Sequence, residues 1–191
     1  MKLGTFMMPL HPPEKSRTIC FEEDIELVLL ADELGFTEAW VGQHHTVAWE
    51  PIPSNDLFIA TVLPRTKNIR FGTGVSIIPQ HHPANIAVHL AFLDHLSRGR
   101  IYCGFGQGGV PTDWGLFDLP DPKTQGLMTL EGIDMILKLV SIGSQRTIEF
   151  IMISLCISPR NINQRTNRFL QFFRLTSVTV ACCLNHSIDR R

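Results

Sequence analysis

The chain has 191 residues, of which 44% are hydrophobic and 18% are charged, and its formal net charge at pH 7 is −1. That length accommodates one domain with a sizeable core, and a globular protein with neither a membrane span nor a secretory signal is expected, because the apolar runs are too short. The five cysteines are odd in number and show no C-x-x-C spacing, so we expect no disulfide framework and no zinc site, and a cytoplasmic location.

The chain opens with a predicted strand, helix and strand. Residues 2–8 form the first strand, which ends at Pro9. A cluster of acids at 22–24 indicates the start of a helix, and Gly35 indicates its end. Residues 38–42 follow as a second strand. This order predicts that the two strands are parallel.

Two adjacent histidines, His44 and His45, follow the second strand directly. In α/β enzymes the chemistry lies at the carboxyl ends of the strands. Imidazoles donate or accept hydrogen bonds and shuttle protons near neutral pH, so the pair is a catalytic candidate. The alternative is that both are ordinary loop residues.

Two further strand-and-helix units follow along the chain. Residues 57–63 predict a helix that ends at Pro64, and residues 69–78 predict a strand. Gly72 and Gly74 inside that strand indicate a bulge or a ligand lying against the backbone. Pro83 suits the first position of the next helix, and Arg98 with Gly99 ends it.

A fourth strand, residues 100–105, leads into a glycine-rich loop. Residues 104–109 satisfy the G-x-G-x-x-G pattern of dinucleotide sites, but residues 110–126 are expected to be loop, with no helix opening after the glycines. A loop beside a flavin or a plain turn are the other interpretations. A helix over 130–140 brings the count to four strand-helix units, half of a (β/α)8 barrel of the α/β class.

From residue 141 the composition changes. Residues 142–191 hold seven arginines, no lysine and two acids, and they show no period. We therefore expect two regions, 1–140 and 141–191, the second being unrelated or disordered, with no nucleic-acid partner. The histidine pairs 44–45 and 81–82 could in principle gather around a metal ion. Neighbouring side chains in a strand point to opposite faces, so no metal site is expected.

Five stretches, taken together, carry a family resemblance. Residues 2–140 resemble the amino-terminal half of the bacterial luciferase-like flavin-dependent monooxygenases, in the branch that includes limonene monooxygenase. The matching stretches are residues 31–45, 70–75, 82–83, 93–100 and 104–108. Gln43 departs from the glutamate that is usual in this branch.

The resemblance implies a TIM barrel in which reduced FMN lies at the carboxyl ends of the strands and reacts with O2 to oxygenate a small organic substrate. A flavin reductase would supply the reduced FMN. His44 matches the active-site histidine, and His45 would orient it. Gly74 and Val75 match a bulge, often a cis peptide, that supports the flavin ring. Gly104, Gly106 and Gln107 would complete the flavin-binding loop.

Two alternatives stay open beside this function. A deazaflavin cofactor and hydride transfer would use the same fold. The chain could instead be an inactive half-barrel, because residues 141–191 do not resemble the second half of the family. A half-barrel leaves open sheet edges and an apolar face, so we expect homo-oligomers or aggregation.

Overall fold

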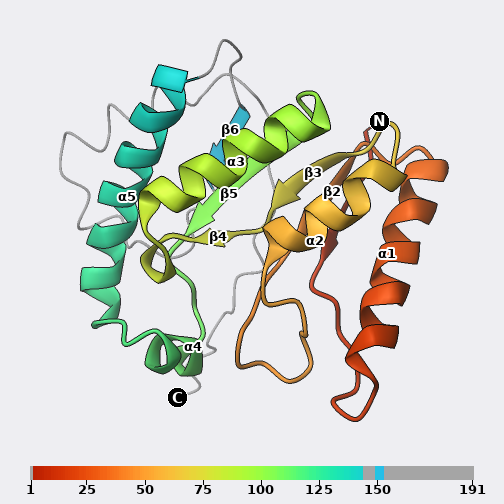
Figure 1. Ribbon diagram of the computed structural model, residues 1–191. Helices are drawn as coiled ribbons and strands as arrows, with labels where there is room; N and C mark the ends of the chain where they lie inside the picture. The colour runs from red at the N-terminus through yellow and green to blue at the C-terminus, as the bar shows by residue number, and fades with distance from the viewer. Residues whose placement is uncertain (1, 144–148, 153–191) are drawn as a thin grey trace, which may run out of the picture. The chain divides into compact units, whose positions relative to one another are not determined.

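The computed structural model describes residues 2–143 and 149–152 of the chain (Figure 1). Strands and helices alternate along the described part. In chain order the elements are β1 Gly4–Met7, α1 Arg17–Glu33, β2 Glu38–Val41, α2 Asn55–Val62, the 3-10 turn η1 Leu63–Arg65, β3 Arg70–Thr73, β4 Ser76–Ile77, the 3-10 turn η2 Ile78–Gln80, α3 Pro83–Ser97, β5 Ile101–Gly106, α4 Pro111–Leu116, α5 Pro122–Gly143 and β6 Glu149–Met152. None of the described helices is long and apolar enough to cross a membrane.

The strands form one parallel sheet in which β1, β2, β3 and β5 lie in that order. One row of the register runs through Phe6, Trp40, Gly72 and Tyr102. β4 continues beside the far end of β5, and β6 pairs with β5 as well. The predicted parallel pairing of the first two strands is confirmed, β3 and β5 extend the sheet in the same direction, and the sheet is a partial α/β barrel.

One face of the sheet carries the core, because side chains alternate between the two faces of a strand. Val41, Phe71 and Cys103 are fully buried from the strands, and they pack with Ile59 of α2 and Ile136 of α5. Figure 1 shows the helices lying over this face of the sheet. Helices therefore cover one face of the parallel strands, as in a barrel wall.

The opposite face carries the row through Trp40 and Tyr102, whose rings stack at 5.8 Å between centroids and 6° between planes. Gly72 lies between them in the register. A Cβ atom added to Gly72 would come within 2.3 Å of the Trp40 ring. The absence of a side chain at Gly72 therefore lets the two rings approach each other across β3.

Helix α1 begins at Arg17, five residues before the acidic cluster that was expected to mark its start. Cys20, Asp24, Val28 and Ala31 are its buried residues, and they recur at intervals of three or four. Burial of Cys20 requires the helix to extend toward its N-terminus. The acids at 22–24 therefore fall in the second turn.

The expectation that residues 110–126 are loop is wrong. Helix α4 begins at Pro111, and α5 begins at Pro122, well before the expected residue 130. Proline suits the first helical position because its missing N–H would have no partner there. Asp121 accepts hydrogen bonds from the backbone N–H groups of Lys123 and Thr124. These prolines therefore begin helices.

Beyond residue 140, where no structure was expected, the described residues include β6. Its register with β5 places Tyr102 beside Glu149 and Phe105 beside Met152. The sheet therefore takes a strand from this region. The division of the chain at residue 140 stays a prediction.

Candidate active site

The expected site residues gather at the carboxyl ends of β2, β3 and β5. Val41 and Thr73 are register partners at the ends of β2 and β3. Just beyond them, the backbone N–H of Gly74 donates to the carbonyl of Val41 at 2.7 Å. His44 follows β2 by three residues and Val75 follows β3 by two, so both lie at this edge of the sheet.

The third strand is interrupted at Gly74 and Val75, which are joined by a cis peptide bond. The side chain of Asn55, 2% exposed, lies against this interruption. Its Nδ2 donates to the Val41 carbonyl at 3.3 Å and to the Val75 carbonyl at 3.1 Å. Asn55 therefore joins the end of β2 to the break in the third strand.

The interrupted segment packs closely on its neighbours. A Cβ atom added to Gly106 would lie 2.7 Å from Cγ2 of Val75, and one added to Gly74 would lie 2.8 Å from the Phe6 ring. Both glycines therefore permit close contact, Gly106 between β5 and the Val75 side chain, and Gly74 between the break and β1.

His44 is held between two carboxylates. Its Nε2 lies 2.8 Å from Oε2 of Glu50, and its Nδ1 lies 3.7 Å from Oδ2 of Asp113. The Glu50 contact is not aligned as a hydrogen bond, and Nδ1 has no hydrogen-bond partner among the described residues. The imidazole therefore has a free nitrogen and a negative environment, which suit a group that binds or moves a proton.

Asp113, near the start of α4, is 1% exposed and fixes the loop that carries both histidines. Its carboxylate accepts hydrogen bonds from the Thr46 backbone N–H at 2.8 Å, the Thr46 hydroxyl at 2.6 Å and the His45 N–H at 3.4 Å. Burial favours a higher pKa, but the bonds from Thr46 and His45 outweigh it and hold the pKa of Asp113 below its usual value. The carboxylate is therefore ionised at neutral pH.

His45 has partners different from those of His44. Its Nε2 lies 3.1 Å from Oε1 of Gln80, and its ring meets that of Phe117 edge-on at 4.7 Å. The expected role of His45 as the residue that orients His44 stays a prediction, since the polar contacts shown for the His44 ring are with Glu50 and Asp113.

Gly104 and Gln107 lie along and just after β5. The N–H of Gly104 donates to the Thr73 hydroxyl, and its carbonyl accepts from the same hydroxyl, each at 3.0 Å. Gln107 turns toward α5, where a Cβ atom at Gly126 would lie 3.3 Å from its Oε1. A cofactor contact by Gly104 or Gln107 stays a prediction, and the Gly104 N–H already has a partner within the sheet.

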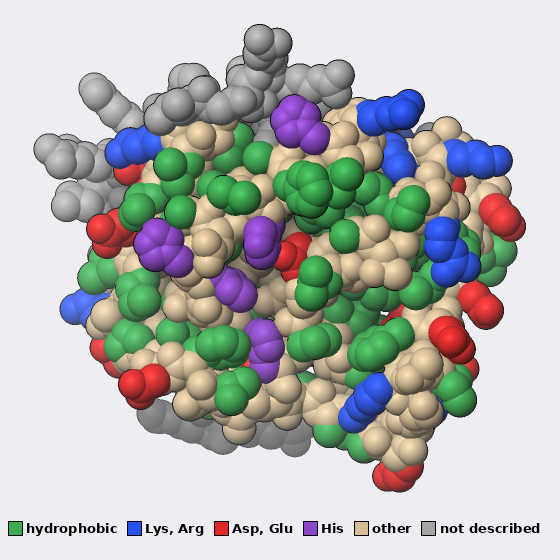
Figure 2. Space-filling model, in the orientation of Figure 1, with side chains coloured by type: hydrophobic (Ala, Val, Ile, Leu, Met, Phe, Trp, Pro, Cys, Tyr) green, Lys and Arg blue, Asp and Glu red, His purple; other side chains and the backbone are tan. Residues whose placement is uncertain are grey.

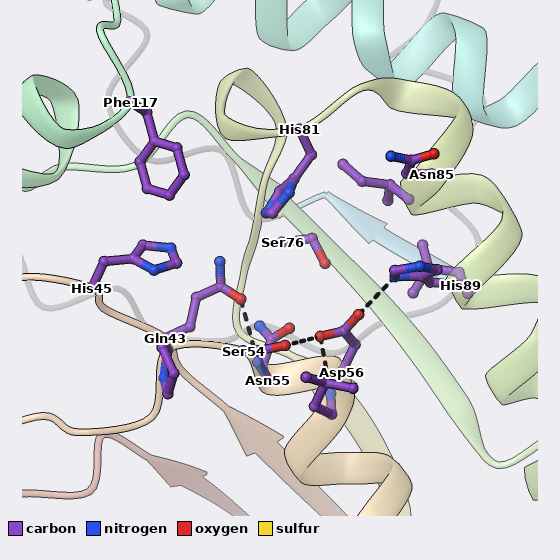
Figure 3. A pocket seen from close by; sticks show the side chains of 14 residues that line it. Gln43, His45, Ser54, Asn55, Asp56, Ser76, His81, Asn85, His89 and Phe117 are labelled. Carbon is purple, nitrogen blue, oxygen red and sulfur yellow. Dashed lines mark hydrogen bonds and ion pairs between the residues drawn. The ribbon is translucent and has the colours of Figure 1, made fainter.

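A cavity of about 360 Å³ opens beside the break, between the loop after β2 and helices α2 and α3 (Figure 3). Histidine side chains gather on this face of the molecule (Figure 2). Asp56 hydrogen-bonds to Ser54, to the Leu57 N–H and to Nδ1 of His89. No group of three or more histidine, cysteine or acidic side chains in residues 2–143 and 149–152 could hold a metal ion. The residues that line the cavity are Gln43, His45, Pro53, Ser54, Asn55, Asp56, Leu57, Ser76, His81, Asn85, Ile86, His89, Leu90 and Phe117.

Sequence reasoning missed three residues that hold the site, Glu50, Asn55 and Asp113. Asn55 lies two residues before the helix predicted over residues 57–63, and Asp113 fell in a stretch expected to be loop. Asp113 lies two residues after Pro111, and a proline followed by an acid is typical of a helix start, so this pattern could have indicated helix α4.

Residues 1–161 match the family model described as luciferase-like monooxygenase. The chain belongs to this family. Similar curated proteins include the 4-hydroxyprotoasukamycin monooxygenase of Streptomyces nodosus subsp. asukaensis, 40% identical over 74% of this chain and 38% of the relative. The limonene 1,2-monooxygenase of Rhodococcus erythropolis is 37% identical over 72% of this chain and 35% of its own length. The resemblance expected from the sequence is confirmed.

Among solved structures, the chain resembles the oxygenating constituent of 3,6-diketocamphane monooxygenase from Pseudomonas putida, a type II Baeyer-Villiger monooxygenase in complex with FMN. The TM-score is 0.70 and the identity 27%, over 73% of this chain and 39% of that one. The chain therefore spans little more than a third of the relatives it matches. The family model also continues past residue 140, over residues for which no family resemblance was expected.

Proposed function

We propose that the chain forms the wall around the active-site histidine of an FMN-dependent monooxygenase that acts on a small organic substrate. The observation that carries the proposal is the position of His44 at the same sheet edge as the Gly74-Val75 break, between Glu50 and Asp113. Family membership and the FMN in the related structure support it.

The residues at this edge fit a flavin. Val75 is half-buried and packs on Gly106, so it offers an apolar side chain at this edge against which a flat ring could lie. His44 Nδ1 is a buried nitrogen without a hydrogen-bond partner among the described residues. Gly74, Val75, Gly106 and Gln107 would hold the group through their backbone and side-chain atoms. When bound, reduced FMN supplies the electrons that activate O2.

The chain's own groups then have definite tasks. His44 holds or moves a proton at Nδ1, beside the carboxylates of Glu50 and Asp113. Asn55 holds the Gly74-Val75 segment in place, because its Nδ2 donates hydrogen bonds to the carbonyls of Val41 and Val75. The proposal includes a separate flavin reductase that supplies the reduced FMN. It also includes further residues, outside those described, that complete the wall of the site.

The test is a titration of the purified chain with FMN, followed by flavin fluorescence, with riboflavin and the deazaflavin F420 in parallel. We expect saturable FMN binding that weakens several-fold in Val75→Asp, which places a charge on the apolar surface. Absence of saturable FMN binding, or binding of F420 alone, would overturn the proposal.

A further inference from the structure

The loop that follows the two adjacent histidines, residues 46–50, brings Glu50 to the ring of His44. Its largest side chain, Trp49, is 56% exposed. Apolar packing therefore does little to hold the loop, and its position depends on hydrogen bonds. One of these closes a turn within the loop, because the backbone N–H of Glu50 donates to the Val47 carbonyl at 3.1 Å.

Two further hydrogen bonds hold the loop from the segment that joins β1 to α1. Nη2 of Arg17, the first residue of α1, donates to the Ala48 carbonyl at 2.9 Å. The backbone N–H of His11 donates to the Trp49 carbonyl at 2.8 Å. The two acceptors are consecutive carbonyls, and Glu50 is the next residue. These bonds therefore fix the backbone directly before Glu50.

His11 is itself fixed by a buried pair. Its Nε2 lies 2.9 Å from Oδ1 of Asp24 on α1, and the two residues are 8% and 5% exposed. Burial raises the pKa of Asp24 above its usual value, because the charged carboxylate loses its contact with water. The pair therefore opposes the cost of burying this carboxylate, and it attaches the segment that carries His11 to a defined position on the helix.

Glu50 distinguishes the two nitrogens of the His44 ring. Its Oε2 lies 2.8 Å from Nε2, whereas Nδ1 lies 3.7 Å from Oδ2 of Asp113. A carboxylate oxygen only accepts hydrogen bonds, so the shorter contact favours a proton on Nε2. The neutral ring then has its lone pair on Nδ1, the nitrogen that has no hydrogen-bond partner among the described residues.

We propose that Glu50 is a positioning residue that sets the tautomer of His44. Arg17 and His11 form a clamp that keeps Glu50 in place. The clamp fixes the loop, the loop places the carboxylate at Nε2, and this leaves Nδ1 free to accept a proton. The catalytic meaning of this arrangement rests on the proposed function, but the tautomer and the clamp themselves require neither flavin nor substrate.

The experiment is long-range proton–nitrogen NMR of the histidine rings in the full chain, at alkaline pH, where an ordinary imidazole carries one proton. This spectrum distinguishes a protonated ring nitrogen from an unprotonated one, and the His44 signals are assigned by their loss in His44→Gln. We expect the proton on Nε2 in the parent. Glu50→Met removes the acceptor and leaves the Asp113 carboxylate on the Nδ1 side, so the population should shift toward the form with the proton on Nδ1.

Arg17→Met should cause a smaller shift in the same direction, because it removes the donor to the Ala48 carbonyl and lets Glu50 move away. Arg17→Lys should restore most of the parent spectrum, since an ammonium group also donates to a carbonyl. Arg65→Met is the matched control, because it makes the same change at an exposed arginine of η1. It should leave the His44 signals where they are in the parent.

A parent with the proton on Nδ1 would overturn the role of Glu50, as would equal tautomer populations in the parent and Glu50→Met. An unchanged His44 spectrum in Arg17→Met, or no recovery in Arg17→Lys, would overturn the clamp. The signals of the other histidines check that each variant is folded. If Arg17→Met does not fold, amide hydrogen exchange of the parent decides, because exchange at the His11 N–H as fast as in an open chain would refute its bond to the loop.

The FMN titration separates this inference from the proposed function. The expected His44 tautomer without saturable FMN binding would refute the flavin proposal and leave the clamp standing. Saturable FMN binding with the His44 proton on Nδ1 would refute only the role of Glu50.

Discussion

The carboxylate of Asp113 accepts hydrogen bonds from both the backbone N–H and the hydroxyl of Thr46, 67 residues earlier in the chain. The contact joins the loop after β2 to the start of α4, which follows β5. His44 lies beside the same carboxylate, with Nδ1 3.7 Å from Oδ2. The position of the candidate catalytic imidazole therefore depends on a residue from a distant part of the sequence.

We expect Asp113→Asn to lower the free energy of unfolding by about 1 to 2 kcal/mol, because its amide nitrogen cannot accept from the His45 N–H and the charged acceptor for Thr46 is lost. Urea denaturation measures the change. Asp118→Asn makes the same substitution at an exposed position of the next turn and should have little effect. Equal losses in the two variants would contradict the role given to Asp113.

A pH-dependent contribution to stability is expected from Asp32. It accepts from the backbone N–H groups of Lys67, Asn68 and Ile69, at 2.7, 3.0 and 2.7 Å. Burial favours a higher pKa, but these bonds outweigh it and hold the pKa below its usual value. A lowered folded-state pKa stabilises the protein above the unfolded value, near pH 4, and this stability is lost as the pH falls through the folded value.

Asp32→Asn should therefore cost about 1 kcal/mol at pH 7, and the difference from the parent should shrink below about pH 4. Urea denaturation at pH 7, 5 and 3 gives the comparison, with Glu33→Gln as the exposed neighbouring control. A difference that stays constant across this range would show that ionised Asp32 is not what stabilises the turn.

Gly72→Ala tests the packing of the two aromatic rings across β3. The added methyl group would come within 2.3 Å of the Trp40 ring, which is stacked on Tyr102. Overpacking of this kind costs about 1 to 3 kcal/mol. Gly109→Ala adds the same atom where nothing lies within 4 Å, so its melting temperature should match that of the parent. A similar result for Gly72→Ala would show that the ring can move at little cost.

The sheet could be predicted from the sequence because its signals are local. Each strand is a short apolar run that ends at proline or glycine, and Gly35 and Gly99 have the positive φ expected after helices, 80° and 87°. Pro111 and Pro122 were misread because proline both breaks a helix and begins one. Which of these effects applies depends on the residues that follow.

The candidate site was predictable only in part, for a physical reason. His44 could be found because it follows a strand. Its partner Asp113 is 69 positions away, and Asn55 holds the Val75 carbonyl across 20 positions. Neither pair leaves a periodic pattern, since the contact arises only when parallel strands bring their carboxyl ends together. Likewise, only the three-dimensional contacts show that Nε2 of Gln43 has no hydrogen-bond partner among the described residues.

Asn55→Leu should weaken FMN binding if the flavin proposal holds. The variant removes both hydrogen bonds that Asn55 donates, so the Val75 carbonyl loses this partner while the Val41 carbonyl keeps only the N–H of Gly74. We expect a several-fold rise in the FMN dissociation constant, measured by fluorescence, together with a loss of about 2 kcal/mol in the free energy of unfolding. Asn85→Leu, an exposed amide on α3, should change neither. Unchanged FMN affinity in Asn55→Leu would show that the Gly74-Val75 break does not contribute to FMN binding.

In the presence of the purified 191-residue chain, O2 is expected to oxidise reduced FMN without formation of oxygenated product. It spans little more than a third of its relatives, and within the described residues β1 pairs only with β2. A barrel excludes water only when its sheet closes, and an open site lets water compete with the substrate. FMN, a flavin reductase with NADH, O2 and norcamphor, a bicyclic ketone, would be mixed with the chain, and product and hydrogen peroxide measured separately. We expect peroxide at the rate found without protein. Product formed in proportion to FMN oxidation would show that this chain completes a working site.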